Sequence, residues 1–188
     1  MKLLELACLV SDRAQLLNVP HMVVGAIAVG AYGIARATKD VDLLVSMDPT
    51  CGVFQLMTGL DDLVEFEPQA QFDTITWGRR WIGLTKSVPP FTVELFEMLD
   101  DPFCVSEFAR RVKKFVPYLQ RDLWLPTAED VVVQKIRWGR PKDLDDARDV
   151  LAVQGPETLE MEYIRHWCSL HATTLQLETL LSSLPPMD

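Results

Sequence analysis

The chain has 188 residues, of which 48% are hydrophobic and 24% charged, and its formal net charge is −9. Such a composition is typical of a soluble globular protein, and the length allows one core with a helical extension. The acidic balance argues against a general nucleic-acid coat, but it does not exclude a local basic groove.

The cysteine pattern and the apolar runs argue against a disulfide framework and a membrane span. No Cys-x-x-Cys pair occurs, so we interpret the four cysteines as reduced thiols. The longest uncharged apolar run, 22–34, is too short and too rich in glycine to cross a bilayer. Glu5 interrupts the N-terminal apolar run, and no cleavage site follows, which favours an amphipathic helix over a signal peptide. We expect a soluble, cytoplasmic protein.

Hydrophobic periodicity divides the chain into a mixed first half and a helical second half. In the first half, in chain order, it predicts a helix at 2–17, a strand at 21–24, a helix at 25–33, a strand at 40–46, a helix at 50–59 with its start signal at 48–50, and strands at 63–66, 72–77, 81–85 and 91–97. In the second half it predicts a helix at 102–113, an extended stretch at 115–124, and helices at 127–138, 142–153, 157–171 and 173–183. We therefore predict an α/β (α+β) protein with a small mixed β-sheet flanked by helices. Its domains would be an α/β core at 1–100 and a mostly helical portion at 101–188.

Two carboxylates interrupt the predicted strand at 40–46. Side chains in a strand alternate with a period of two, so Asp40 and Asp42 share one face, ~6.5–7 Å apart. Two ionised groups beside a core are costly unless they are compensated, and a bound cation is the usual compensation. A third carboxylate, Glu94, lies in the apolar strand F-T-V-E-L-F-E. Other candidates for the third position are Glu97, Asp73 and Glu67.

A glycine ends the apolar run before the first short helix. Helix N-termini behind a glycine present backbone N–H groups to phosphates, which makes Gly25 a candidate triphosphate site. Together with three carboxylates, this is the equipment of phosphoryl or nucleotidyl transfer, in which two divalent ions ~3.5–4 Å apart bind the attacking and leaving oxygens. Close helix–sheet packing is the alternative explanation of Gly25 and the preferred one for Gly30.

Two sequence blocks resemble one known superfamily. The first is G-A-I-A-V-G-A-Y-G-I-A-R-A-T-K-D-V-D-L-L-V, which resembles the nucleotidyltransferase superfamily of DNA polymerase β. Its Tyr-Gly-x-x-Arg-x-Thr form is similar to the bacterial branch of abortive-infection and toxin–antitoxin nucleotidyltransferases. The second block, L-P-T-A-E-D-V-V-V-Q-K-I-R-W-G-R-P-K-D-L-D-D-A-R-D-V-L, resembles the C-terminal motif of that branch. Two blocks in the right order are more specific than either alone.

The resemblance implies a metal site and a catalytic role for the three carboxylates. Asp40, Asp42 and Glu94 would bind Mg²⁺ (or Mn²⁺), and Glu94 would help to take the proton from the acceptor hydroxyl. Gly25 and Ala26 would hold the triphosphate of an NTP.

The resemblance implies less specific roles for two basic residues in these blocks. Arg36 would reach the phosphates or brace the acidic strand, and a buried pairing with Asp40 fits equally well. Lys135 would lie at the cleft that the helical portion closes.

Charged runs elsewhere have an ordinary explanation. The acidic run that begins at Asp143 is interpreted as favourable charge in the first turn of a helix, with a functional part for Asp143 or Lys142 as the alternative. Arg79-Arg80 is interpreted as part of a solvated basic face, with a localised patch for an anionic substrate as the alternative.

The implied reaction transfers a nucleoside monophosphate from an NTP to an acceptor hydroxyl and releases pyrophosphate. The acceptor would be an RNA 3′ end, a protein side chain or a small molecule, and an antitoxin-like protein partner or a role in phage defence would fit the branch. The alternative is a catalytically degenerate nucleotide-binding or protein-interaction module. Ala26 supports it, because the superfamily has Gly or Ser there, and Glu94 replaces the commoner Asp.

Overall fold

The computed structural model describes residues 2–46, 48 and 52–185. The chain forms two compact units. Unit 1 comprises Met1–Ile27 and Ala37–Pro126, and unit 2 comprises Ala28–Arg36 and Thr127–Asp188. This division differs from the predicted boundary at residue 100 because the strands after that point belong to unit 1, and because a short early segment belongs to unit 2.

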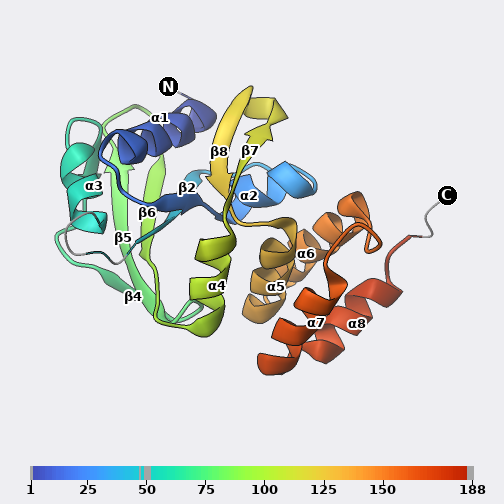
Figure 1. The fold of residues 1–188 in the computed structure, drawn as a ribbon. Helices are drawn as coiled ribbons and strands as arrows, with labels where there is room; N and C mark the ends of the chain where they lie inside the picture. Colours follow the sequence, from blue (N-terminus) through green and yellow to red (C-terminus); the bar gives the residue numbers. More distant parts are fainter. Residues whose placement is uncertain (1, 47, 49–51, 186–188) are drawn as a thin grey trace. The chain divides into compact units, whose positions relative to one another are not determined.

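Unit 1 combines a β-sheet with helices and a hairpin (Figure 1). Its elements are α1 (Leu3–Leu16), β1 (His21–Val23), the start of α2 (Gly25–Tyr32), β2 (Asp40–Val45), α3 (Val53–Gly59), β3 (Val64–Phe66), β4 (Gln71–Asp73), β5 (Gly78–Thr85), β6 (Thr92–Glu97), α4 (Pro102–Arg110), β7 (Val112–Val116), the 3₁₀ turn η1 (Pro117–Leu119) and β8 (Arg121–Leu125).

The sheet is mixed, as predicted. Its strand order is β1-β2-β6-β5-β3, and β4 pairs with β5 outside this path. β2 and β6 are parallel, whereas β1–β2, β5–β6, β3–β5 and β4–β5 are antiparallel. The parallel pair therefore lies inside the sheet, with neighbours on both sides.

The two faces of the sheet are covered differently. One face carries Val41, Leu43 and Leu95, all fully buried, and it packs under α1 and α3, where Phe54 of α3 contacts Trp81 of β5 edge to face. The opposite face is covered at one end by α4, whose Phe108 packs with Met22, Leu44 and Phe96. The half of this second face that begins at the start of β2 carries polar side chains instead.

Unit 2 is helical. It contains the end of α2, α5 (Ala128–Trp138), α6 (Pro141–Gln154), α7 (Met161–Leu170) and α8 (Thr174–Ser182). The Thr127 side chain caps α5 by accepting a hydrogen bond from Asp130 N at 3.3 Å, and Gly139 ends the helix in the left-handed conformation. Fully buried Val132, Leu151 and Ile164 form part of the apolar interior.

Some predicted boundaries were wrong. The strand predicted at 72–77 ends at Asp73, because the Asp73 carboxylate accepts hydrogen bonds from Ile75 N and Thr76 N and so holds a turn there. The helix predicted to reach residue 113 ends at Arg110, because the following residues pair as β7 with β8. Turn backbone occupies the residues before Met161, so α7 starts later than predicted.

Other predictions fall partly outside the described residues. Positions 49 and 50 of the predicted helix start lie there, and so does the cysteine at position 51. Cys8, Cys104 and Cys168, which lie among the described residues, take part in no disulfide bond. None of the described helices is long and apolar enough to cross a lipid bilayer.

Candidate functional site

The acidic pair of β2 lies on one face of the sheet. Asp40 and Asp42 are half-buried, while Val41 and Leu43 between and after them are buried, so the strand alternates as its sequence predicts. The backbone N–H of Asp40 donates a hydrogen bond to Thr38 Oγ1 at 3.2 Å, which ties the start of β2 to the turn before it. Both carboxylates therefore project from the start of an internal strand.

Strand register brings Glu94 to this pair. In the parallel β2–β6 ladder Asp42 is the direct partner of Glu94, and neighbouring strands lie ~4.8 Å apart. Burial raises the pKa of Glu94, and the negative charge of Asp40 adds to this rise while Arg80 opposes it. The effect of Asp40 on this pKa indicates that the two carboxylates lie within electrostatic range of one another.

The other candidates for the third carboxylate have structural partners. Glu97 lies on the opposite face of β6, where its carboxylate accepts from Trp81 Nε1 at 2.8 Å and pairs with Arg79 at 2.7 Å. Asp73 holds the turn after β4. Glu67 is exposed and accepts from Gln71. Of the four, the register places Glu94 beside the pair.

Gly25 makes room for Asp42. Its φ of +63° belongs to the left-handed region, and a Cβ added there would lie 2.0 Å from Asp42 Oδ2. Val24 N donates to Asp42 O at 2.9 Å just before this turn, which ties the start of α2 to β2. Only glycine has both the conformation and the space required, so the first N–H groups of α2 come close to the acidic strand. Ala26 follows in the first turn and is buried.

Arg80 is the residue of this face that the sequence interpretation missed. Its Nη1 donates to Glu94 Oε2 at 3.1 Å, and the side chain is 29% exposed. The sequence interpretation left Arg79 and Arg80 in the turn between two predicted strands, whereas both lie in β5, where consecutive side chains point to opposite faces.

The donor set of this face fits a hard divalent cation. Carboxylate oxygens are the ligands that Mg²⁺ and Mn²⁺ take, and Asp40, Asp42 and Glu94 share one face with a glycine that leaves space beside Asp42. As the side chains stand, no group of three His, Cys, Asp or Glu in the described part of the chain could hold a metal ion. The Glu94 carboxylate accepts a hydrogen bond from Arg80 in this arrangement.

The two other predicted basic residues lie in unit 2 and bind carboxylates there. Arg36 makes a bidentate pair with Asp146, with distances of 3.0 and 3.2 Å. Lys135 is 4% exposed, and its Nζ lies 3.0 Å from Asp143 Oδ1 and 2.8 Å from Asp146 Oδ2. Both cations therefore act on the acidic run of α6.

Asp143 and Asp146 are buried, which the interpretation of the run as favourable charge in a first helical turn did not anticipate. Burial alone would raise the pKa of Asp143, but hydrogen bonds from Arg140 and Lys135 outweigh it and hold the pKa below its ordinary value. The pKa of Asp146 is likewise lowered, by Arg36 and Lys135 against the effect of burial. Both groups are thus ionised members of a buried charge cluster.

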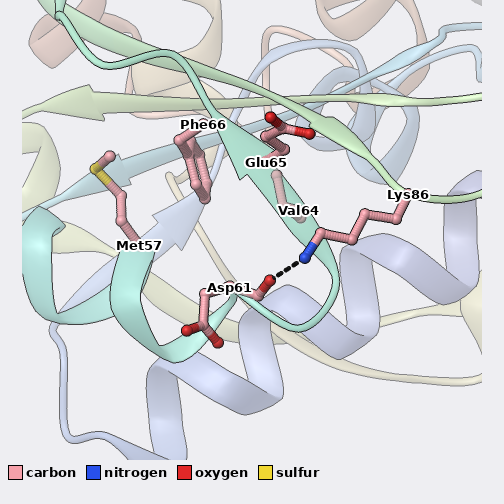
Figure 2. Close-up of a pocket in the computed structure, with 6 residues that line it drawn as sticks. All are labelled: Met57, Asp61, Val64, Glu65, Phe66 and Lys86. Carbon is pink, nitrogen blue, oxygen red and sulfur yellow. Dashed lines mark hydrogen bonds between the residues drawn. The ribbon is translucent and has the colours of Figure 1, made fainter.

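A pocket of about 500 Å³ lies elsewhere, at the β3 edge of the sheet (Figure 2). It is lined by Met57, Asp61, Val64, Glu65, Phe66 and Lys86. Lys86 closes one side by donating to Asp61 O at 2.5 Å. The pocket contains none of the predicted site residues, and its mixed apolar and charged lining carries no recognisable reaction chemistry.

A family model described as "Nucleotidyltransferase of unknown function (DUF6036)" matches residues 1–175. The chain belongs to this family. The predicted nucleotidyltransferase superfamily is therefore confirmed, while the toxin–antitoxin branch stays a prediction. No curated protein matches the chain.

Solved structures agree on the fold. The solution structure of the antibiotic-resistance factor ANT(2'')-Ia has a TM-score of 0.60 at 11% identity and covers 95% of this chain and 96% of that one. An antigenic nucleotidyltransferase-like protein from Paracoccidioides brasiliensis has a TM-score of 0.53 at 20% identity, covering 97% and 94%. A putative nucleotidyltransferase from Thermotoga maritima, TM1012, has a TM-score of 0.54 at 16% identity, covering 79% and 91%. The predicted nucleotidyltransferase fold is thus confirmed.

Proposed function

We propose that this protein transfers a nucleoside monophosphate from an NTP to an acceptor hydroxyl and releases pyrophosphate. The observation that carries the proposal is the register of β2 and β6, in which Asp42 is paired with Glu94 on the face that Asp40 shares. Three carboxylates on one face supply the hard oxygen ligands that a divalent cation takes, and the cation in turn binds the phosphates of an NTP.

The chain's own groups divide the work. Asp40, Asp42 and Glu94 would hold Mg²⁺ (or Mn²⁺), and the N–H groups at Gly25 and Ala26 would hold the triphosphate. Bound there, the cation would polarise the phosphoryl oxygens and acidify the attacking hydroxyl. The acceptor oxygen forms a bond to the α-phosphorus, the bond from that phosphorus to the bridging oxygen breaks, and pyrophosphate leaves. Glu94, half-buried and paired in register with Asp42, would take the hydroxyl proton.

The acceptor is an RNA 3′ end, a protein side chain or a small molecule. The structural relative ANT(2'')-Ia has been solved in complex with adenylyl-2''-tobramycin, at a TM-score of 0.58 and 14% identity. That complex supports including aminoglycosides among the acceptors to be tested. A toxin–antitoxin or phage-defence role, with cytoplasmic NTP as the donor, would instead predict transfer of the nucleoside monophosphate to RNA or protein. An antitoxin-like protein partner would then inhibit this activity.

The test combines pyrophosphate release with label transfer. The full chain is incubated with Mg²⁺ and each α-labelled NTP in the presence of RNA, cell protein or aminoglycosides, beside Asp40→Asn and Asp42→Asn. Loss of a metal ligand removes several kcal/mol of transition-state stabilisation, so both variants should be slower by about 10²-fold or more.

The second function, a nucleotide-binding module without turnover, is favoured by Ala26 and by the pairing of Glu94 with Arg80. Metal-dependent NTP binding without transfer to any acceptor would support the module. Metal-dependent NTP binding that is unchanged in both Asn variants would refute the site.

A further inference from the structure

The pairing of Arg80 with Glu94 places a cation at a carboxylate that the proposed reaction needs for a metal. In the antiparallel β5–β6 ladder Glu94 is opposite Ile82, so Arg80 reaches it diagonally along the same face. Nη1 and Oε2 are 3.1 Å apart, and the two side chains are 29% and 17% exposed. Among the described residues, Arg80 makes the one hydrogen bond to this carboxylate.

The pair has the geometry of a replaceable contact. A single guanidinium N–H of Arg80 donates to a single carboxylate oxygen of Glu94, and Arg80 Nε is buried without a hydrogen-bond partner. Arg36, by contrast, binds Asp146 through two parallel hydrogen bonds. A bidentate pair is strong and directional, whereas a single contact that leaves a buried donor unsatisfied is much weaker.

We propose that Arg80 is a built-in counter-ion, which holds Glu94 while the metal is absent and which a divalent cation must displace. The inference rests on the proposed metal site. It accounts for three carboxylates on one face, because the guanidinium 3.1 Å from Glu94 offsets part of their negative charge. It also makes metal binding weaker than the carboxylates alone would allow, since a dication entering beside Asp42 meets the positive charge of Arg80.

The neighbouring arginine supplies a matched control. Arg79 precedes Arg80 in β5, but it pairs with Glu97 on the opposite face, at 2.7 Å, and is 65% exposed. Arg79→Gln removes the same charge one residue away and leaves Glu94 untouched. Arg80→Lys keeps the charge at the site, whereas Arg80→Gln and Arg80→Met remove it.

The experiment measures Mn²⁺ affinity of the full chain without nucleotide, by electron paramagnetic resonance of free Mn²⁺. Arg80→Gln should bind Mn²⁺ about tenfold more tightly than the wild type, whereas Arg79→Gln and Arg80→Lys should bind like the wild type. Circular dichroism checks folding, and Arg80→Met replaces the Gln variant if that variant does not fold.

Two results would overturn the inference, and they differ in meaning. In the first, Asp42→Asn loses Mn²⁺ binding, which shows that the wild type binds the ion through Asp42, but Arg80→Gln binds Mn²⁺ equally or more weakly than the wild type. Arg80 then supports Glu94, and the proposed competition between Arg80 and the cation is wrong. If Mn²⁺ does not bind, or binds equally in Asp42→Asn, the metal site of the proposed function fails, and this inference fails with it.

Discussion

Gly25 is the residue whose backbone and missing side chain both shape the candidate site. Its φ of +63° is accessible to glycine but strained for other residues, and the Asp42 carboxylate occupies the position of its Cβ. The turn at Gly25 and the acidic strand therefore depend on one another, and a substitution in either should alter the conformation of both.

For Gly25→Ala we expect a loss of stability of about 1–2 kcal/mol from the left-handed backbone, together with a loss of Mn²⁺ binding because Asp42 must move. Gly139→Ala is the matched control. Gly139 also has a positive φ, of +67°, but a Cβ there would meet only Ile136 O at an ordinary 3.6 Å. This control should show the stability loss alone, as measured by urea unfolding and Mn²⁺ titration. Equal Mn²⁺ binding in both variants would contradict the role of Gly25.

At the scale of elements, Lys135 links α5 to α6 within unit 2. Its ammonium lies between Asp143 and Asp146, which also bind Arg140 and Arg36. A buried ion pair contributes little compared with a well-packed apolar replacement, but removing one partner leaves uncompensated charge inside the protein. The cluster therefore makes helix packing sensitive to each member.

Lys135→Met keeps the apolar stem and removes the charge, so unfolding in urea should show a loss of about 3–5 kcal/mol. Lys142→Met on α6 changes an exposed lysine in the same way and should stay within about 0.5 kcal/mol of the wild type. A similar small effect for both variants would show that Asp143 and Asp146 are satisfied without Lys135.

At the scale of the whole molecule, the buried charge cluster around Lys135 makes the free energy of unfolding depend on pH. The pKa of Asp143 is below its ordinary value of 3.8 in the folded protein, so its contribution to stability is present above that pH and is lost as the pH falls through the folded-state pKa. Asp143→Asn should therefore be less stable than the wild type at pH 7, by about 3 kcal/mol. The difference should shrink below pH 3.8. Urea unfolding from pH 7 to 3 measures it, and a difference independent of pH would exclude the ion pair as its source.

The two units also show that chain order and spatial order differ. Residues 28–36 belong to unit 2, where Arg36 binds Asp146 and the Gln154 side chain donates to Tyr32 O. The hairpin of β7 and β8 belongs to unit 1. A boundary drawn from the change to helical sequence could not find either exchange, because both depend on contacts between residues far apart in the chain.

Local patterns determined most of the elements and the chemistry of the candidate site. The alternation in β2 alone puts Asp40 and Asp42 on one face, and the glycine before α2 follows from the same stretch. These features are readable because strand and helix periodicities and turn conformations are set by neighbouring residues. The family resemblance belongs to this level too, since it rests on short blocks.

Only the tertiary structure decided which distant groups meet. The parallel register pairs Glu94 with Asp42 and leaves Glu97 on the other face, and the β5–β6 ladder brings Arg80 to Glu94. Register and ion pairing depend on through-space packing and on charges brought together by the fold, and no periodicity along the chain records them. The sequence by itself therefore predicted the acidic strand and its glycine turn, while the fold selected their partners.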